Sequence, residues 1–437
     1  MTATTSASLF LRNARLLGRM VDVAVADGRI ASVTDSGAGC TPAGTDAGSG
    51  AAPAGAESID AKGMVLFPAF IDAHTHMREP GQEYKEDIAS GLAAAAHGGF
   101  GAVLCMANTE PVNDDASITR DMIDTARRHW PHGPRLHPIG AATVGLKGTE
   151  LAPLAELAEA GCVAFSNDGA PVPDTEMFRR CVEYAADQGK VVIDHCEDPY
   201  LAKGAHMNEG ETSGRIGVKG QPDIGEALHV ARDILLADYL KLPIHLAHIS
   251  CRRSVELIAW AKQRGVPVTA ETCPHYLLLT DKELLGYDTK AKVNPPLRTD
   301  DDVAALREAV QSGVIDILAT DHAPHAAHEK ETPLDEAPNG ITGLDTAVAL
   351  TWGLVREGVL TEADLIRLWA TEPGKIFGLP VNGFNVGDPA DFFLLDPEKK
   401  WVPSRETMHS KSLNTPFLGK ELVGRVKALW LGGVKVV

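Results

Sequence analysis

Residues 224–271, IGEALHVARDILLADYLKLPIHLAHISCRRSVELIAWAKQRGVPVTAE, alternate between two kinds of apolar pattern. Helical periodicity covers 224–240 and 252–264, whereas short β-rich runs cover 243–248 and 266–271. Strands that alternate with helices in this way form βαβ units, in which the strands are parallel. The stretch therefore predicts an α/β fold with a parallel sheet.

The same alternation extends on both sides of this stretch, from residue 65 to residue 379. It gives eight candidate strands: 65–73, 101–107, 136–141, 162–166, 190–195, 243–248, 266–271 and 315–320. Further helical patterns lie between them, among others at 116–130, 174–188 and 302–311. Eight strands in about 260 residues match the size of a (β/α)8 TIM barrel. A doubly wound open sheet is the alternative, because it has the same alternation of strands and helices.

A second β-rich sequence pattern occurs at the two ends of the chain. It covers residues 9–35, where Asp27-Gly28 between two apolar runs predicts a hairpin, and it returns after Leu379. Neither end alone has enough strands for a core of its own. We therefore expect 1–64 and 380–437 to form one small β-sandwich-like domain beside the barrel.

Within the N-terminal part, residues 36–56 are rich in Gly, Ala and Pro and almost free of aliphatic side chains. This composition predicts a flexible insertion. The barrel itself is expected to span 65–379.

Composition and charge exclude several classes of protein. The chain has 437 residues and a net charge of −18, which disfavours binding to nucleic acid or to an anionic membrane. Its seven cysteines contain no CxxC pair, which is typical of reduced thiols in a cytoplasmic protein. Arginines at 12, 15 and 19 interrupt any signal-peptide core, and no apolar run approaches the length of a membrane helix.

The first barrel strand ends in FIDAHTHMR, which places His74 and His76 two residues apart. Side chains at this spacing on a strand point to the same face, so the two imidazoles can bind one metal ion. A pair of structural histidines is the alternative for this motif alone. Catalytic groups of barrel enzymes lie at the carboxyl ends of the strands, which is where this pair falls.

Four further strand ends carry a metal-ligand residue type: Asp168, His195, His248 and Asp321. Each alone is explained by ordinary loop chemistry, but together with His74 and His76 they predict a metal site. Imidazole and carboxylate ligands favour Zn²⁺, with Mn²⁺, Co²⁺ or Fe²⁺ as alternatives. Six ligands exceed the need of one Zn²⁺, which favours two ions that share a carboxylate. His245, three residues before His248, is expected to point to the opposite face.

These residues resemble the ligand set of the amidohydrolase superfamily. Within it, HTHMREPGQEYKEDIASG and ATDHAPH resemble the two signature segments of class I dihydroorotases. The resemblance implies that His74, His76 and Asp321 bind the first metal ion, that His195 and His248 bind the second, and that Asp168 bridges them. Related cyclic amidases use a carboxylated lysine as the bridge, and no lysine lies closer to Asp168 than Lys147 and Lys190.

The same resemblance implies four substrate-binding residues: Arg78, Asn108, Asn294 and His325. Arg78 follows the two histidines at a spacing of two, and its planar guanidinium suits a carboxylate. Turn chemistry is the alternative for the two asparagines. Two positions depart from the family pattern, because Ala107 replaces a usual proline and Asn167 replaces a usual aspartate. Asn167 removes a charge beside the metal ligands, which changes the electrostatic environment of those ligands.

The function implied is a metal-dependent hydrolase of cyclic amides, a dihydroorotase of de novo pyrimidine (UMP) biosynthesis. It interconverts N-carbamoyl-L-aspartate and dihydroorotate with metal-activated water, and Asp321 is expected to act as general acid and base. Three alternatives stay open: a hydantoinase, dihydropyrimidinase or allantoinase; a mononuclear deaminase; and a non-catalytic partner of aspartate transcarbamoylase. An active chain could also associate with that transferase or form a homodimer. The polar segment 323–343 is expected either to cover the substrate as a lid or to be a solvated loop.

Overall fold

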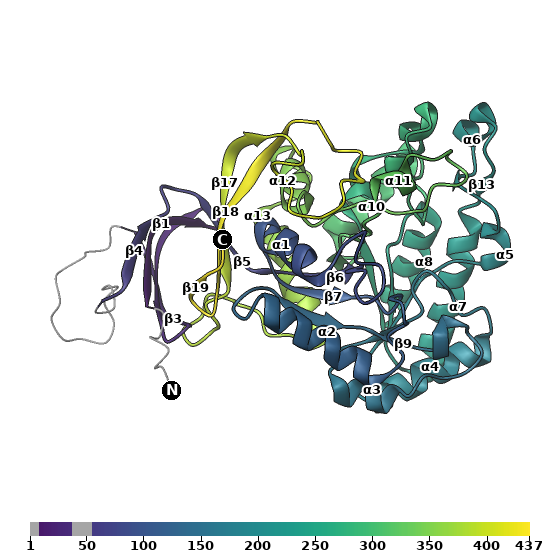
Figure 1. Cartoon of the computed structure of the whole chain (residues 1–437), viewed down its shortest axis with the longest axis horizontal. Coiled ribbons are helices and arrows are strands. Elements are labelled where there is room, and N and C mark those ends of the chain that lie inside the picture. The colour runs from purple at the N-terminus through teal and green to yellow at the C-terminus, as the bar shows by residue number, and fades with distance from the viewer. Residues whose placement is uncertain (1–7, 37–54) are drawn as a thin grey trace.

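The computed structural model describes residues 8–36 and 55–437, which form a barrel of parallel strands with a β-sheet at one side (Figure 1). The barrel strands are β6 (Phe70–Thr75), β7 (Phe100–Cys105), β8 (Arg135–Pro138), β9 (Gly140–Ala141), β10 (Phe165–Ser166), β11 (Val192–Asp194), β14 (Ile244–Leu246), β15 (Val268–Thr272) and β16 (Ile317–Leu318). The longer helices around them are α1 (Ile88–Gly98), α2 (Ala116–His129), α3 (Leu154–Ala160), α4 (Thr175–Asp187), α7 (Ile224–Leu240), α8 (Arg252–Gln263), α10 (Asp300–Ser312) and α12 (Ala347–Arg356).

The barrel closes through eight strand positions. One run of parallel strands has the order β6-β7-β8, and a second has the order β16-β15-β14-β11-β10-β9. Strand β8 passes into β9 across the single residue Ile139, which joins the two runs. A parallel bridge between Thr75 and His322 closes the remaining gap. This closure confirms the predicted (β/α)8 barrel over the open-sheet alternative.

The helices begin where the sequence supplies capping side chains. Asp115 accepts a hydrogen bond from the backbone of Ser117 at the start of α2, and Asp174 does the same for α4. Thr299 and Asp302 form a reciprocal capping box at the start of α10. Helix α7 has the predicted bounds, and the other predicted helices differ by one or two residues at an end.

The chain termini share one sheet, which curls around an apolar cluster of its own. Its strands are β1 (Leu9–Leu16), β2 (Arg19–Ala26), β3 (Arg29–Asp35), β4 (Glu57–Asp60), β5 (Val65–Pro68), β17 (Phe392–Trp401), β18 (Leu422–Leu431) and β19 (Val434–Lys435). Strand β5 lies between β1 and β17, so it joins the two ends of the chain. Asp27 and Gly28 both have positive φ, at 52° and 72°, which confirms the predicted hairpin between β2 and β3.

The prediction of one strand over 65–73 is wrong. Residues 65–68 form β5 of the terminal sheet, and β6 of the barrel begins at Phe70. Pro68 has no N–H for a ladder, and the Ala69 N–H donates to Asp391 O as the chain changes sheets. The terminal sheet therefore extends past the boundary expected at residue 64. Strands β10 and β16 have two residues each, so the predicted runs 162–166 and 315–320 were too long.

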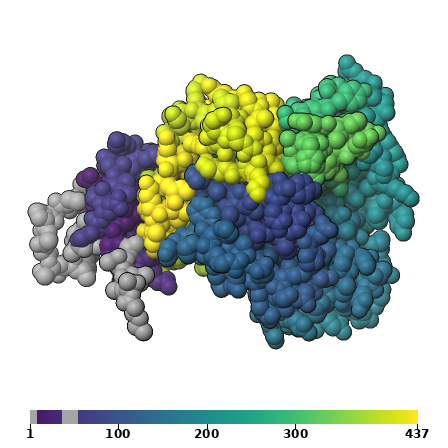
Figure 2. Space-filling view, viewed as in Figure 1, coloured from purple at the N-terminus to yellow at the C-terminus, as the bar shows by residue number. Residues whose placement is uncertain are grey.

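Apolar side chains fill the inside of the barrel, where residues such as Ile71, Leu104 and Ile193 form one buried cluster. In Figure 2 the C-terminal segment (yellow) lies against the early part of the barrel (blue). Strand β18 packs beside α1 and α12. The cysteines at 105, 162, 181, 196, 251 and 273 are buried and free, whereas Cys40 and most of the predicted insertion lie outside the described residues. Within the described ranges, no helix combines the length and apolar character that a membrane crossing requires.

Candidate metal and substrate site

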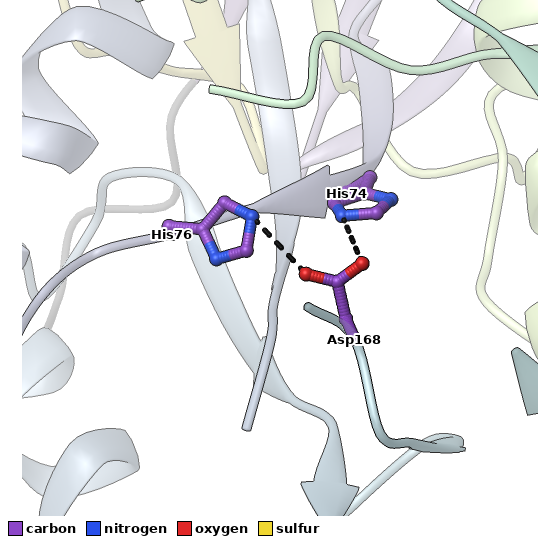
Figure 3. Close-up of side chains that lie close together, drawn as sticks. All are labelled: His74, His76 and Asp168. Carbon is purple, nitrogen blue, oxygen red and sulfur yellow. Dashed lines mark ion pairs between the residues drawn. The ribbon is translucent and has the colours of Figure 1, made fainter. Parts of the chain in front are cut away.

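Asp168 lies at the centre of the residues that the sequence singled out. Its Oδ1 is 3.4 Å from His74 Nε2 and its Oδ2 is 3.5 Å from His76 Nε2 (Figure 3). Both histidines come from β6 or its carboxyl end, and Asp168 follows β10. All three side chains are buried, so these charges and dipoles interact with little screening from water.

A second group of ligand atoms meets the same carboxylate. Asp168 Oδ1 is 3.3 Å from both His195 Nδ1 and His248 Nε2, and these two nitrogens are 2.8 Å apart. Asp321, which follows β16, adds its Oδ1 at 3.2 Å from His76 Nε2 and 3.6 Å from His74 Nε2. The structure thus brings all six predicted ligands to one place.

The charges at this place suit cations. Burial alone would lower the pKa of His74, but the Asp168 and Glu271 carboxylates raise it well above its ordinary value. Burial would raise the pKa of Asp168, but the positive field and hydrogen bonds of the histidines hold it well below its usual range. The pKa of Asp321 is also lowered, since the hydrogen bond from His76 and the charge of His74 outweigh burial. Both carboxylates therefore stay ionised in the protein interior.

Three site residues have backbone φ angles in the left-handed region: Arg78 at 59°, His248 at 32° and Asp321 at 46°. Non-glycine residues rarely adopt this conformation, and each instance costs about 1–3 kcal/mol. Such strain is retained where the rest of the structure imposes it, and here it aims two ligands and the arginine at the cavity.

Glu271 is a site residue that the sequence analysis missed. Its Oε1 is 2.7 Å from His74 Nδ1, which fixes the ring and leaves His74 Nε2 facing Asp168. Its Oε2 is 3.1 Å from His245 Nε2. The available signal was a carboxylate within the buried strand β15.

The His245 ring contacts Glu271 Oε2 and Thr269 Oγ1, whereas the His248 ring contacts Asp168 and His195. Only the backbone N–H of His248 donates to Glu271. Strand β14 ends at Leu246 and His248 has a positive φ, so the regular alternation of side chains assumed for this pair does not extend to His248.

The two predicted asparagines contact the back of the imidazole ligands. Asn108 Oδ1 is 2.8 Å from His76 Nδ1. Asn294 Nδ2 is 3.3 Å from His195 Nε2 and donates to Glu197 Oε2 at 2.8 Å. Each amide group therefore orients a histidine as well as facing the cavity.

A cavity of about 280 Å³ opens above the cluster. Nine of the ten predicted residues line it: His76, Arg78, Asn108, Asp168, His195, His248, Asn294, Asp321 and His325. The tenth, His74, is fully buried beside them. Neither Lys147 nor Lys190 lines this cavity.

The Arg78 guanidinium has no carboxylate partner among residues 8–36 and 55–437. Its Nε donates to Pro324 O at 3.1 Å, and its Nη2 is 3.4 Å from His325 Nε2. Burial and the charge of Arg78 lower the pKa of His325 to about 2, so this imidazole is neutral. A fixed cation thus faces the cavity with its anion-binding capacity unused.

The segment after β16 forms one wall of the cavity, through His325, Asn339 and Gly340. Asn414, from the C-terminal segment, holds it in place, because its Oδ1 accepts from His325 N and its Nδ2 donates to Gly340 O. Lys330 is buried in the same segment and donates to three backbone carbonyls. This wall is therefore attached from two sides.

Comparisons with known proteins identify the family of this chain. A family described as Dihydro-orotase-like matches residues 63–254. A dihydroorotase of Geobacter metallireducens is 48% identical over 381 residues, which cover 87% of this chain and 89% of the relative. A dihydroorotase of Desulforapulum autotrophicum is 45% identical over 405 residues, covering 93% and 92%.

Solved structures of cyclic amidases share the fold. An L-hydantoinase (dihydropyrimidinase) from Arthrobacter aurescens superposes with a TM-score of 0.85 at 22% identity, over 99% of this chain and 96% of that one. A dihydropyrimidinase from Brevibacillus agri has a TM-score of 0.80 at 22% identity, over 98% and 95%. At this identity the likeness establishes the barrel with its terminal sheet, whereas the relatives of 45–48% identity establish the family. The chain belongs to the dihydroorotase family.

Proposed function

We propose that the protein is a dihydroorotase, which interconverts N-carbamoyl-L-aspartate and (S)-dihydroorotate. The observation that carries the proposal is the Arg78 guanidinium, which has no carboxylate partner among the described residues and lines one cavity with five of the six metal-ligand candidates. Dihydroorotate combines a cyclic amide with a carboxylate, so it needs a hydrolytic centre and a fixed cation side by side. Hydantoin and dihydrouracil lack that carboxylate and make no use of Arg78.

The donor set fits two divalent cations. His74 Nε2 is buried without a hydrogen-bond partner and faces two carboxylates. Two groups of ligand atoms, each within 4.8 Å of one another, share Asp168: His74, His76 and Asp168, and Asp168, His195 and His248. We assign the first group, together with Asp321, to one ion and the second group to another. Zn²⁺ is the ion that best matches these ligands. When bound, such ions lower the pKa of water and polarise the amide carbonyl.

The protein side chains supply binding and proton transfer. Arg78 and the neutral His325 hold the substrate carboxylate, and Asn108 and Asn294 contact its ring. Asp321, ionised at neutral pH, accepts the proton of the attacking water and delivers it to the departing ring nitrogen. Ring closure follows the same path in reverse, and this is the direction of pyrimidine synthesis.

The test is hydrolysis of L-dihydroorotate by the metal-loaded protein, with hydantoin and dihydrouracil in parallel. Turnover of dihydroorotate alone supports the proposal. Turnover of hydantoin or dihydrouracil instead would assign the protein to the other cyclic amidases that the sequence left open. Absence of turnover despite bound metal would support the non-catalytic alternative.

Arg78→Lys should raise the KM for dihydroorotate by about 10- to 150-fold, which corresponds to the 1.5–3 kcal/mol of charged hydrogen bonds. Lysine keeps the charge but loses the planar pair of donors that a carboxylate accepts. Steady-state kinetics measure the effect, with Arg120→Lys on the exposed side of α2 as the matched control. An unchanged KM would show that the substrate carboxylate binds elsewhere.

Glu271→Gln should weaken metal binding by about 10- to 100-fold, because the amide no longer fixes His74 as a neutral donor at Nδ1. Equilibrium titration with Zn²⁺ against a competing chelator measures the affinity. Thr269→Val is the control, since Thr269 contacts His245 but not His74. Equal affinities of the two variants would contradict a positioning role for Glu271.

All six ligand candidates belong to one chain, and we expect this chain to be active without a partner. Association with aspartate transcarbamoylase would then add to an active enzyme rather than create one. We place the protein in the cytoplasm on the composition of its reduced cysteines and on its proposed substrate.

A further inference from the structure

Residues 410–414 lie in the connection between β17 and β18, and they reach the wall of the substrate cavity from outside the barrel. Figure 1 shows this connection in yellow, extending from the terminal sheet over the barrel toward α11 (Ala327–Lys330). We call residues 410–414 the strap. Its last residue, Asn414, is 3% exposed and contacts the segment after β16. A polar side chain from the terminal part of the chain is therefore built into one wall of the site.

The Asn414 amide makes three hydrogen bonds to the backbone of that segment. Its Oδ1 accepts from His325 N at 2.9 Å, and its Nδ2 donates to Ala323 O at 2.9 Å and to Gly340 O at 3.0 Å. These partners fix the orientation of the amide, because the N–H requires the oxygen and the two carbonyls require the nitrogen. The amide therefore ties residues 323–325 to Gly340.

Residues 323–325 support both side chains that are proposed to hold the substrate carboxylate. Arg78 Nε donates to Pro324 O at 3.1 Å, and His325 belongs to the stretch itself. Asn414 bonds the residues on both sides of Pro324, so it fixes the carbonyl that the guanidinium uses. One amide thus holds the backbone on which the two groups depend.

The His325 ring has few contacts of its own that fix its place. Its Nε2 is 2.8 Å from Asn339 O, and its Nδ1 is buried without a hydrogen-bond partner among the described residues. The ring packs directly on the backbone of Gly340, where an added Cβ would lie 3.0 Å from His325 Cδ2. A shift of the backbone at either residue would therefore move the ring.

The other end of the strap is attached to a different part of the protein. Ser410 Oγ donates to Glu86 Oε2, and Lys411 N donates to Glu86 Oε1 at 3.0 Å. Glu86 is fully buried shortly before α1. The strap is therefore anchored outside the segment after β16, which allows Asn414 to hold that segment in place.

We propose that Asn414 is a positioning residue for substrate binding, which keeps Arg78 and His325 in the geometry that accepts the substrate carboxylate. Asn414 does not line the cavity, so it acts through residues 323–325 and not on the substrate. The inference rests on the proposed function and adds to it a residue from outside the barrel. Loss of an interaction that is equal in the ground state and the transition state raises KM and leaves kcat unchanged.

Steady-state kinetics of the full-length, metal-loaded protein with L-dihydroorotate test the proposal. Asn414→Ala should raise KM by about 10-fold, which is part of the loss expected when charged hydrogen bonds are removed, and should leave kcat and metal content unchanged. Asn414→Asp keeps the shape of the side chain and the bond from His325 N but loses both donors. It should also raise KM, so the result does not depend on the folding of one variant.

Asn382→Ala is the matched control. Asn382 is also 3% exposed, and its amide also bridges two backbone groups, Asp391 O and Phe384 N, away from the cavity. This variant should retain the KM of the unaltered protein. Thermal unfolding of each variant checks that it is folded.

A double-mutant cycle separates positioning from general support of the fold. In a chain that already carries His325→Ala, Asn414→Ala should raise KM by less than about threefold, because a group that it positions is gone. An unchanged KM in both Asn414 variants, an equal rise in Asn382→Ala, or the same factor in both backgrounds would overturn the proposal. A fall in kcat at constant KM would also overturn it, because the effect would then lie at the metal centre. If the unaltered protein does not turn over dihydroorotate, the proposed function fails and this inference fails with it, whereas normal turnover together with any of these results rejects this inference alone.

Discussion

Asp321→Asn should lower kcat for dihydroorotate by about 10²- to 10⁴-fold, which is the contribution expected of a general acid-base group. Asparagine has nearly the same shape and keeps an oxygen at the position that faces His74 and His76. It cannot accept the proton of water or return it to the ring nitrogen. The expected result is a folded protein that binds metal and substrate and turns over slowly in both directions.

Steady-state kinetics and metal analysis on the same sample measure this effect. Asp335→Asn, an exposed aspartate of the segment after β16, is the control and should retain full activity. A variant at 321 with normal kcat would remove the proton-transfer role. A variant that has lost its metal would show that Asp321 acts mainly as a ligand.

Removal of the metal ions with a chelator should abolish measurable turnover, and addition of Zn²⁺ should restore it. The six candidate ligands are buried, and without a cation the attacking water keeps its ordinary pKa, which is far above that of the Asp321 carboxylate. Because the folded state alone assembles these ligands, saturating metal should also raise the free energy of unfolding, by about 2.7 kcal/mol at a hundredfold excess over Kd. Differential scanning calorimetry should record a fall of a few degrees in the unfolding midpoint of the stripped protein.

Asp168→Asn provides the internal control for the metal experiment. Asp168 touches all four histidines, so its loss weakens both groups of ligands together. Its metal content should fall well below that of the unaltered protein, and added Zn²⁺ should not restore activity. Full turnover after chelation, or restoration in the Asp168 variant, would contradict the proposed centre.

The sequence predicted those parts of the molecule that depend on local pattern. The alternation of strands and helices was sufficient to predict the barrel, and the polar residues at five strand ends selected six ligand candidates. The family resemblance added four substrate-binding candidates, and all ten residues meet in or beside one cavity. Features that depend on distant contacts were missed. The predicted strand 65–73 is divided at Pro68 because β5 pairs with β17, which lies more than 300 residues further along the chain. The role of Glu271 depends on the contact between its side chain on β15 and His74 on β6.

Local geometry that periodicity does not encode also limits prediction from the sequence. The prediction for His245 assumed regular alternation beyond Leu246, and the left-handed backbone of His248 ends that alternation.

The terminal sheet has a consequence for folding of the chain during its synthesis on the ribosome. Strand β5 is synthesised early but pairs with β17, which begins at Phe392. At about 5–20 residues per second, roughly 15–65 s separate the two strands during translation. For that time one edge of β5 has no partner, so the nascent chain depends on chaperones or on rapid closure of the barrel to protect it from aggregation. A stop codon before β17 would make that exposed edge permanent.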